Sequence, residues 1–303
     1  DSKYVVASLE KGNKTKNIFA DNLYKDIIDN SSNNSTVFNA VLQNLVDQKF
    51  PVNDDMKEDA ATIIKQIKSA YKSNYGDNYK DSLNQALTSA GYKNLSEYRQ
   101  RMIKQIQYAN FLLDYIDDHF DDVFNDYYQQ CAPKYVSLIK ISVSDTSSPT
   151  DNETSKLNEV KELISNTDKS FGDIAQDYSD DSTSSKKGSL GIVDSKDTSG
   201  IANSYGKDVF NAIEALSEGQ VSDVITGDDG YYFVKVTSTD KKTLKKELKK
   251  TDIDSPLLAY DDYLQYVVYN SYKINYKDKD IKKIVQEVVN KALEERKTER
   301  GEA

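Results

Sequence analysis

Histidine and cysteine, the side chains that most often bind metals or act as nucleophiles, each occur once in the 303 residues. The single Cys131 excludes an internal disulfide and any zinc site built from several thiolates, and we interpret it as a small, half-buried apolar residue. His119 stands among four aspartates, as on the polar face of a helix, whereas a metal site requires ligands at fixed spacing. The sequence contains neither a histidine-dependent nucleophile triad nor a glycine-rich phosphate loop. We therefore expect no metal and no cofactor.

One group of acidic and hydroxyl side chains is spaced like the start of a calcium loop. Asp177, Ser179 and Asp181 alternate as the first ligands of such a loop do. The sixth position lacks the required glycine, and Gly188 stands at the twelfth, where a glutamate would close the site. The spacing therefore does not predict calcium binding.

The same loop belongs to a longer pattern of strands and helices. Residues 178–191 (YSDDSTSSKKGSLG) form a polar, serine-rich loop that ends in Gly-x-Leu-Gly. Residues 136–143 before it (VSLIKISV) alternate as a strand does, and residues 230–236 (GYYFVKV) form a second predicted strand after an Asp-Asp-Gly turn. Between the strands lie three predicted helices, at 153–165, 170–178 and 209–216 (VFNAIEAL), the last followed by SEGQVSDV. This order predicts an α+β domain.

The sequence on both sides of this region is helical. Each flanking segment has few apolar residues, so we infer that the two ends pack together and that the α+β region is inserted between them. The predicted domains are residues 1–133, 134–239 and 240–303. The other predicted elements are a strand at 3–9, a turn at 12–13, helices at 15–28, 37–50, 54–75, 78–90 and 95–130, a Lys-rich linker or helix face at 241–250, helices at 257–269 and 278–296, and a disordered tail at 297–303.

The motif order of the α+β region resembles the parvulin type of peptidyl-prolyl isomerase. In that family a Tyr-Ser-x-Asp loop leads to Gly-Asp-Leu-Gly, then to Phe-x-x-Ala-x-x-x-Leu, to Gly-(Glu/Gln)-(Val/Ile)-Ser and to a final Gly-Tyr-His strand. The whole layout resembles the PrsA and SurA foldases, in which an all-helical chaperone domain made from both chain ends carries an inserted parvulin domain. VLQNLVDQKF at 41–50 and GYKNLSEYRQRM at 91–102 resemble helices of that chaperone domain.

This resemblance assigns site positions. The two catalytic histidines of the family fall on Lys140 and Tyr232, and the cysteine or aspartate that faces the substrate carbonyl falls on Asp181. A lysine cannot accept a hydrogen bond as a neutral imidazole can, so the resemblance implies weak or absent prolyl isomerase activity. Asp181 either belongs to the site or only braces its loop. Lys140 and Tyr232 are either site residues or ordinary strand residues. The substrate-binding positions are Leu190, Val193, Tyr205, Val209 and Phe210.

On this resemblance we expect a foldase that binds exported, unfolded or partly folded polypeptides. It would be an extracytoplasmic lipoprotein of a Gram-positive cell, held on the outer face of the membrane by a lipid-modified cysteine before Asp1, with a homodimer as one option. A formal net charge of −10 argues against nucleic acid as a partner, and no apolar run approaches the roughly 20 residues of a membrane span. Two alternatives remain open, an active isomerase that uses Asp181 and Tyr232, and a non-catalytic surface interaction or structural protein.

Overall fold

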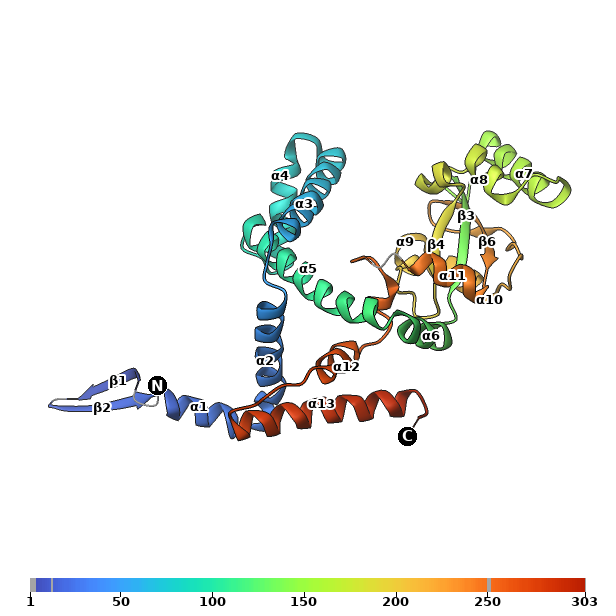
Figure 1. The fold of residues 1–303 in the computed structure, drawn as a ribbon. Coiled ribbons are helices and arrows are strands. Elements are labelled where there is room, and N and C mark those ends of the chain that lie inside the picture. The colour runs from blue at the N-terminus through green and yellow to red at the C-terminus, as the bar shows by residue number, and fades with distance from the viewer. Residues whose placement is uncertain (1–3, 12, 250–251, 303) are drawn as a thin grey trace. The chain divides into compact units, whose positions relative to one another are not determined.

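The computed structural model describes residues 4–11, 13–249 and 252–302 and divides into two compact units. The first unit joins both ends of the chain, Asp1–Tyr115 and Asp262–Ala303, and the second is the continuous stretch Ile116–Asp261 (Figure 1). The predicted fold class is confirmed, because a helical domain from both chain ends carries an inserted α+β domain. No helix within the described part of the chain is both long and apolar enough to cross a membrane.

The first unit begins with a hairpin and a short helix. β1 (Val5–Lys11) and β2 (Lys14–Phe19) pair antiparallel, and α1 (Ala20–Ile28) follows directly. The predicted strand at 3–9 is thus confirmed from residue 5, whereas the helix predicted from residue 15 is wrong up to residue 19, since those residues pair with β1. Lys3 and Gly12, parts of the predicted strand and turn, lie outside the described residues.

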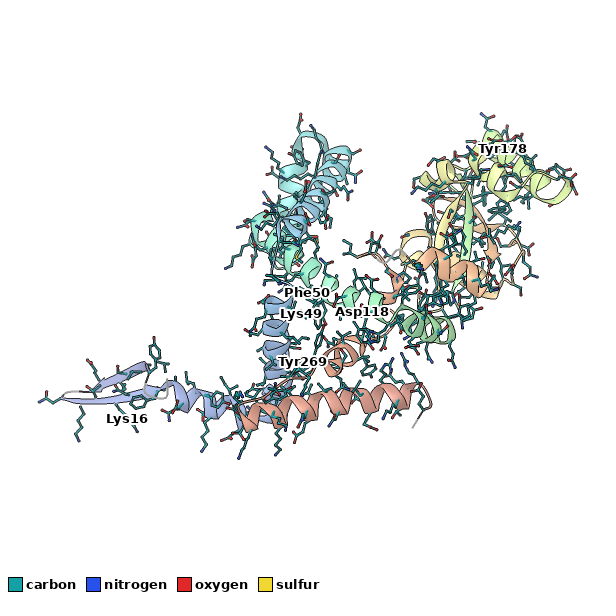
Figure 2. The ribbon with its side chains drawn as sticks, in the orientation of Figure 1. Lys16, Lys49, Phe50, Asp118, Tyr178 and Tyr269 are labelled. Atoms are coloured by element: carbon teal, nitrogen blue, oxygen red, sulfur yellow. The ribbon has the colours of Figure 1, made fainter. Side chains whose placement is uncertain are left out.

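Helices make up the rest of the first unit. Asn53 caps α3 by accepting a hydrogen bond from the Met56 backbone N–H at 2.9 Å. Phe50, at the end of α2 (Figure 2), packs edge-on against Phe111 of α5 with the ring centres 5.9 Å apart. The helices are α2 (Asn34–Lys49), α3 (Asp54–Tyr75), α4 (Tyr79–Ser89), α5 (Leu95–Asp118), α12 (Leu264–Ser271) and α13 (Lys279–Glu299), with short 3-10 turns η1 (Ser31–Asn33) and η2 (Gly76–Asn78).

Two predictions about helix ends are wrong. The helix predicted at 95–130 is interrupted at His119, whose backbone has ψ 27°, and α6 (Phe120–Cys131) restarts after it. The tail predicted to be disordered from residue 297 instead continues α13 to Glu299. Gly301, at φ 67°, then ends the helix, and the Glu302 N–H returns to the Lys297 carbonyl at 2.9 Å.

The second unit is built on a four-stranded antiparallel sheet with the order β4-β3-β6-β5. One face of β3 and β6 carries Ile139, Ile141 and Phe233, which α7 (Asp151–Asn166) and α8 (Phe171–Tyr178) cover. The other face packs against α9 (Ile201–Tyr205) and α10 (Lys207–Ala215). The strands are β3 (Lys134–Ser142), β4 (Ser189–Val193), β5 (Ile225–Thr226) and β6 (Gly230–Ser238).

Three further segments complete this unit. The predicted loop after α8 contains a 3-10 turn, η3 (Ser182–Lys186). The Lys-rich segment is a helix, α11 (Lys241–Leu248), because it buries Leu244 completely and Leu248 nearly so. Pro256 opens the short η4 (Pro256–Leu258), so the helix predicted at 257–269 is divided between η4 and α12. The predicted boundaries at 134 and 239 enclose the sheet, and α6, α11 and η4 belong to the same compact unit.

Candidate functional site

Two neighbouring strands bring Lys140 and Tyr232 together. The two residues are Cα partners across β3 and β6, and the Lys140 ammonium lies 5.6 Å from the centre of the Tyr232 ring. Gly230 permits this pairing, because a Cβ at that position would lie 2.3 Å from the Ile141 carbonyl oxygen. The family resemblance, which placed these two residues at the histidine positions of adjacent strands, predicts this contact.

Asp229 joins the two side chains. The Lys140 ammonium donates a hydrogen bond to Asp229 Oδ2 at 2.5 Å, and the Tyr232 hydroxyl donates to Asp229 Oδ1. The hydrogen bond from Lys140, followed by that from Tyr232, lowers the pKa of the Asp229 carboxyl. Burial, followed by the hydrogen bond to Asp229, raises the pKa of the Tyr232 hydroxyl. At neutral pH the site therefore holds an ionised carboxylate and a protonated tyrosine whose proton points at it.

A cavity of about 490 Å³ lies beside this cluster. Three of the predicted positions, Tyr205, Val209 and Tyr232, line it together with Asp229. The Tyr205 and Tyr232 rings meet edge-to-face with their centres 6.2 Å apart, so they form an aromatic wall. The remaining lining residues come from α9, from α10 and the glycine before it, from β5 and from the turn between β5 and β6: Ala202, Asn203, Ser204, Gly206, Lys207, Asp208, Ile225, Thr226, Gly227 and Asp228.

Asp181 contacts the wall of this cavity and also braces its own loop. Its Oδ1 accepts hydrogen bonds from the Thr183 backbone N–H at 2.9 Å and from the Thr183 hydroxyl at 2.6 Å, which caps η3. The Tyr205 hydroxyl lies 3.4 Å from the same oxygen. Burial, followed by the negative charge of Asp181, raises the pKa of Tyr205 to about 12. The bracing role is therefore present in the fold, beside the long contact with Tyr205.

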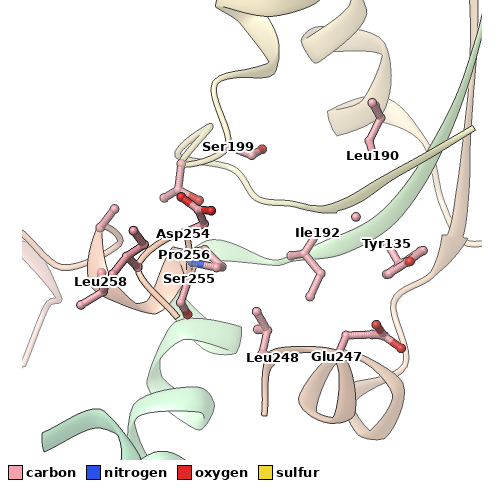
Figure 3. A pocket seen from close by; sticks show the side chains of 14 residues that line it. Tyr135, Leu190, Ile192, Ser199, Glu247, Leu248, Asp254, Ser255, Pro256 and Leu258 are labelled. Atoms are coloured by element: carbon pink, nitrogen blue, oxygen red, sulfur yellow. The ribbon is translucent and has the colours of Figure 1, made fainter. Parts of the chain in front are cut away.

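The other predicted substrate-binding positions lie away from this cavity. Val193 is fully buried, and Phe210 packs against the same apolar core. Leu190 lines a different cavity of about 630 Å³, between β4 and the segment that contains Pro256 (Figure 3). Val209 lines the cavity. Phe210 is the next residue of α10, so its side chain leaves the helix in a different direction from that of Val209.

The sequence contained a signal for Asp229 that the prediction did not use. The Asp-Asp-Gly turn directly precedes the strand of Tyr232, and a carboxylate there is three residues from that tyrosine. Its reach to Lys140 depends on how the turn between β5 and β6 closes, with the Gly227 N–H bonded to the Gly230 carbonyl at 2.9 Å. Tyr205 was predicted, but its contact with Asp181 was not.

The arrangement can hold a small apolar group beside a fixed charge. Lys140 and Tyr232 each donate a hydrogen bond to Asp229, and the lysine has no acceptor with which to replace a neutral imidazole. His119 stands at the start of α6 and does not line the cavity. Cys131 is completely buried. Within the described residues, no group of three or more His, Cys, Asp or Glu side chains is arranged to hold a metal ion.

Comparison with known proteins identifies the sheet-containing region. Residues 138–238 match the rotamase family model, the PPIC-type PPIase domain. The foldase protein PrsA of Staphylococcus aureus (strain MRSA252) is 31% identical over 159 residues, which are 50% of this chain and 47% of that protein. PrsA of Staphylococcus epidermidis (strain ATCC 12228 / FDA PCI 1200) is 35% identical over 136 residues, 43% of this chain and 39% of that protein. The chain thus spans about half the length of these relatives or less.

Two solved structures of proteins named PrsA align with most of this chain. PrsA from Streptococcus pneumoniae aligns with a TM-score of 0.42 and 20% identity, covering 93% of this chain and 99% of that one. PrsA from Bacillus subtilis aligns with a TM-score of 0.41 and 22% identity, covering 94% of this chain and 98% of that one.

Proposed function

Because the chain is a PrsA-like protein with a PPIC-type PPIase domain at residues 138–238, we propose that it is a foldase that binds incompletely folded polypeptides and has weak or no prolyl isomerase activity. The proposal rests on one observation, the engagement of Lys140 and Tyr232 by Asp229. The cavity beside them provides an aromatic wall for a proline ring.

The physical argument concerns what isomerisation requires. Rotation about a peptide bond crosses a barrier of about 18–20 kcal/mol, and a catalyst must bind the twisted amide more tightly than the planar one. Such preference needs side chains that can exchange hydrogen bonds with the amide as it twists. The Tyr232 hydroxyl would have to leave the Asp229 carboxylate to donate its proton to the amide, and the lysine could only donate and never accept. Binding of an extended segment in the cavity requires no such change.

Peptide binding and holding activity test the proposal separately. A labelled Ala-Pro peptide should bind the full chain, and Tyr205→Ala should weaken binding by about 10-fold, equivalent to about 1.4 kcal/mol. Tyr178→Ala is the matched control, because Tyr178 lies on the α8 side of the sheet. Light scattering of a chemically unfolded client should fall when the chain is present. No peptide binding and no protection of the client would favour a surface interaction or structural protein.

We also propose that the protein acts outside the cytoplasm of a Gram-positive cell, on exported polypeptides and from a lipid anchor. The PrsA likeness supports this location. Protease added to intact cells should degrade the protein while a cytoplasmic marker survives. Survival of both proteins under these conditions would contradict the location, and loss of membrane association after removal of a lipid-modified cysteine would test the anchor.

A homodimer is proposed from the N-terminal arm, defined as β1, β2 and α1. Most of the exposed large apolar side chains of the described residues lie in this arm or directly before it, with Tyr75 and Ile253 elsewhere, and α1 buries none of its residues. A two-stranded hairpin is only marginally stable by itself in water, so a second copy of the arm would supply the missing apolar contact. The exposed apolar side chains of the arm are Val5, Val6, Leu9, Ile18, Leu23, Tyr24 and Ile27, and Tyr4 directly precedes it.

A further inference from the structure

Two adjoining cavities in the first unit form a groove that is separate from the parvulin-type site. One, of about 450 Å³, lies between α3 and α5 and has Ile64 and Leu95 among its lining residues. The other, of about 270 Å³, lies where α4 joins these two helices. Leu95 lines both cavities, and α3 contributes to both, so we name them together the α3–α5 groove. None of its residues belongs to the region 138–238.

The first half of the groove is cationic. Lys65, Lys68 and Arg99 line it, and all three are exposed. None of the three forms an ion pair with another described residue. Glu97, the acidic residue two positions before Arg99, instead accepts the Lys93 backbone N–H at 2.7 Å at the start of α5. The cationic half therefore retains uncompensated positive charge over an apolar floor.

The second half of the groove is aromatic. The Tyr92 and Tyr98 rings meet edge-on with their centres 5.0 Å apart, and Tyr71 stacks on Tyr75 at 5.5 Å. Tyr71, Tyr92 and Tyr98 are half-buried and line the cavity beside Leu87. Tyrosine presents a rigid apolar ring with a polar tip, so it can contact apolar side chains without requiring a dry surface.

We propose that the α3–α5 groove is a second polypeptide-binding surface, selective for extended segments in which acidic residues stand next to aromatic or large apolar ones. The acidic side chains would contact Lys65, Lys68 and Arg99, and the apolar side chains would contact the tyrosines. Charge complementarity selects the acidic component of the segment. The aromatic half distinguishes such a segment from a simple polyanion, which would use only the cations. This surface does not depend on the activity of the parvulin-type site.

Three labelled twelve-residue peptides test the proposal on the full chain. One carries Phe and Glu, the second carries Phe with Gln in place of Glu, and the third carries Ser with Glu. At low ionic strength the Phe/Glu peptide should bind about 10-fold more tightly than either of the others, because only it uses both halves. The difference between the Phe/Glu and Phe/Gln peptides should shrink in 0.5 M salt, a condition of roughly 4 Å screening length.

Charge variants locate the binding surface. Lys65→Gln/Lys68→Gln/Arg99→Gln should abolish the advantage of Glu over Gln. The matched control Lys282→Gln/Lys283→Gln/Lys291→Gln removes the same charge from exposed positions of α13 and should preserve that advantage. Tyr71→Ser should reduce the advantage of Phe over Ser. Thermal melting of each variant verifies that it is folded.

Several outcomes would overturn the proposal, and the first two need no variant. Equal binding of the Phe/Glu and Phe/Gln peptides to the unaltered chain would exclude acidic selection. Equal binding of the Phe/Glu and Ser/Glu peptides would identify a simple anion site. Unchanged binding to the triple variant would place the peptide elsewhere. Loss of Phe/Glu binding in Tyr205→Ala would place it in the parvulin-type cavity, whereas failure of the Ala-Pro peptide to bind would leave the groove proposal unaffected.

Discussion

Lys140 and Tyr232 occupy opposite positions on β3 and β6, and a single carboxylate, that of Asp229, binds both side chains. Lys140 is mostly buried, with 18% of its side chain exposed, whereas Asp229 is 65% exposed. The ammonium therefore depends on this carboxylate more than the carboxylate depends on it. The contact that stabilises the lysine also commits one of its three donors and holds the ammonium beside Asp229.

Removal of Asp229 should destabilise the second unit. Asp229→Ala leaves the Lys140 ammonium without its carboxylate, and we expect a loss of about 1 kcal/mol in the free energy of unfolding by urea. Asp229→Ala combined with Lys140→Ala should cost less than the sum of the single changes. A coupling free energy of zero in this double-mutant cycle would contradict the bridge.

The buried pair of Tyr127 and Asp194 should contribute more to stability. The Tyr127 hydroxyl donates to Asp194 Oδ2 at 2.8 Å, and both side chains are inaccessible to solvent. Tyr127→Phe leaves the buried carboxylate with one donor fewer, so unfolding free energy should fall by about 1–3 kcal/mol. Tyr178→Phe, which removes an exposed hydrogen bond to Glu159, should cost about 0.5 kcal/mol or less. Equal effects of the two changes would refute this ranking.

Glu153 should make stability depend on pH. The Thr150 backbone N–H, followed by that of Ser144, lowers the pKa of Glu153 from 4.5 to about 2. A carboxyl whose folded pKa is depressed stabilises the fold above its unfolded pKa and loses that contribution as the pH falls toward its folded pKa. Glu153→Gln should therefore lower the melting temperature at pH 6 and have less effect near pH 2. Glu162→Gln, an exposed change in the same helix, serves as the control, and a pH-independent effect of Glu153→Gln would contradict the assignment.

The N-terminal arm should determine self-association. Leu9 is 64% exposed and Leu23 is 46% exposed, so charges at these positions cost the monomer little. Leu9→Asp/Leu23→Asp should convert the proposed dimer into a monomer, measured as mass by light scattering during gel filtration. Lys14→Asp/Lys25→Asp changes charge in the same arm without removing an apolar side chain. A monomeric unaltered chain, or a variant that remains dimeric, would rule out this interface.

Much of the site could be predicted because strands have a simple period. Alternation in 136–143 and 230–236 predicts which residues share a face, and the family resemblance aligns Lys140 with Tyr232. Asp229 could not be assigned in the same way, because a turn residue has no periodic neighbour. Its partners follow from the closure of the turn before β6, which is a three-dimensional property.

The fold was predictable where one helix buries one continuous stripe of apolar side chains. α3 has the predicted bounds, since its apolar residues keep helical spacing between a capping Asn53 and Gly76. The segment 95–130 keeps the same spacing on both sides of His119, so periodicity gives no sign of the break. The hairpin was missed because residues 15–19 contain apolar residues compatible with either a strand or the first turn of a helix.

Prolyl isomerase activity of the full chain is the most direct test of the central claim, that Lys140 and Tyr232 no longer perform the work of the two histidines. Magnetisation-exchange NMR on an Ala-Pro peptide gives the rate without a coupled protease. Since positioned acid–base groups contribute about 10²–10⁴-fold in many enzymes, we predict a kcat/KM below about a tenth of that of a parvulin with both histidines, unchanged by Tyr232→Phe. A parvulin-like kcat/KM that Tyr232→Phe abolishes would contradict the account.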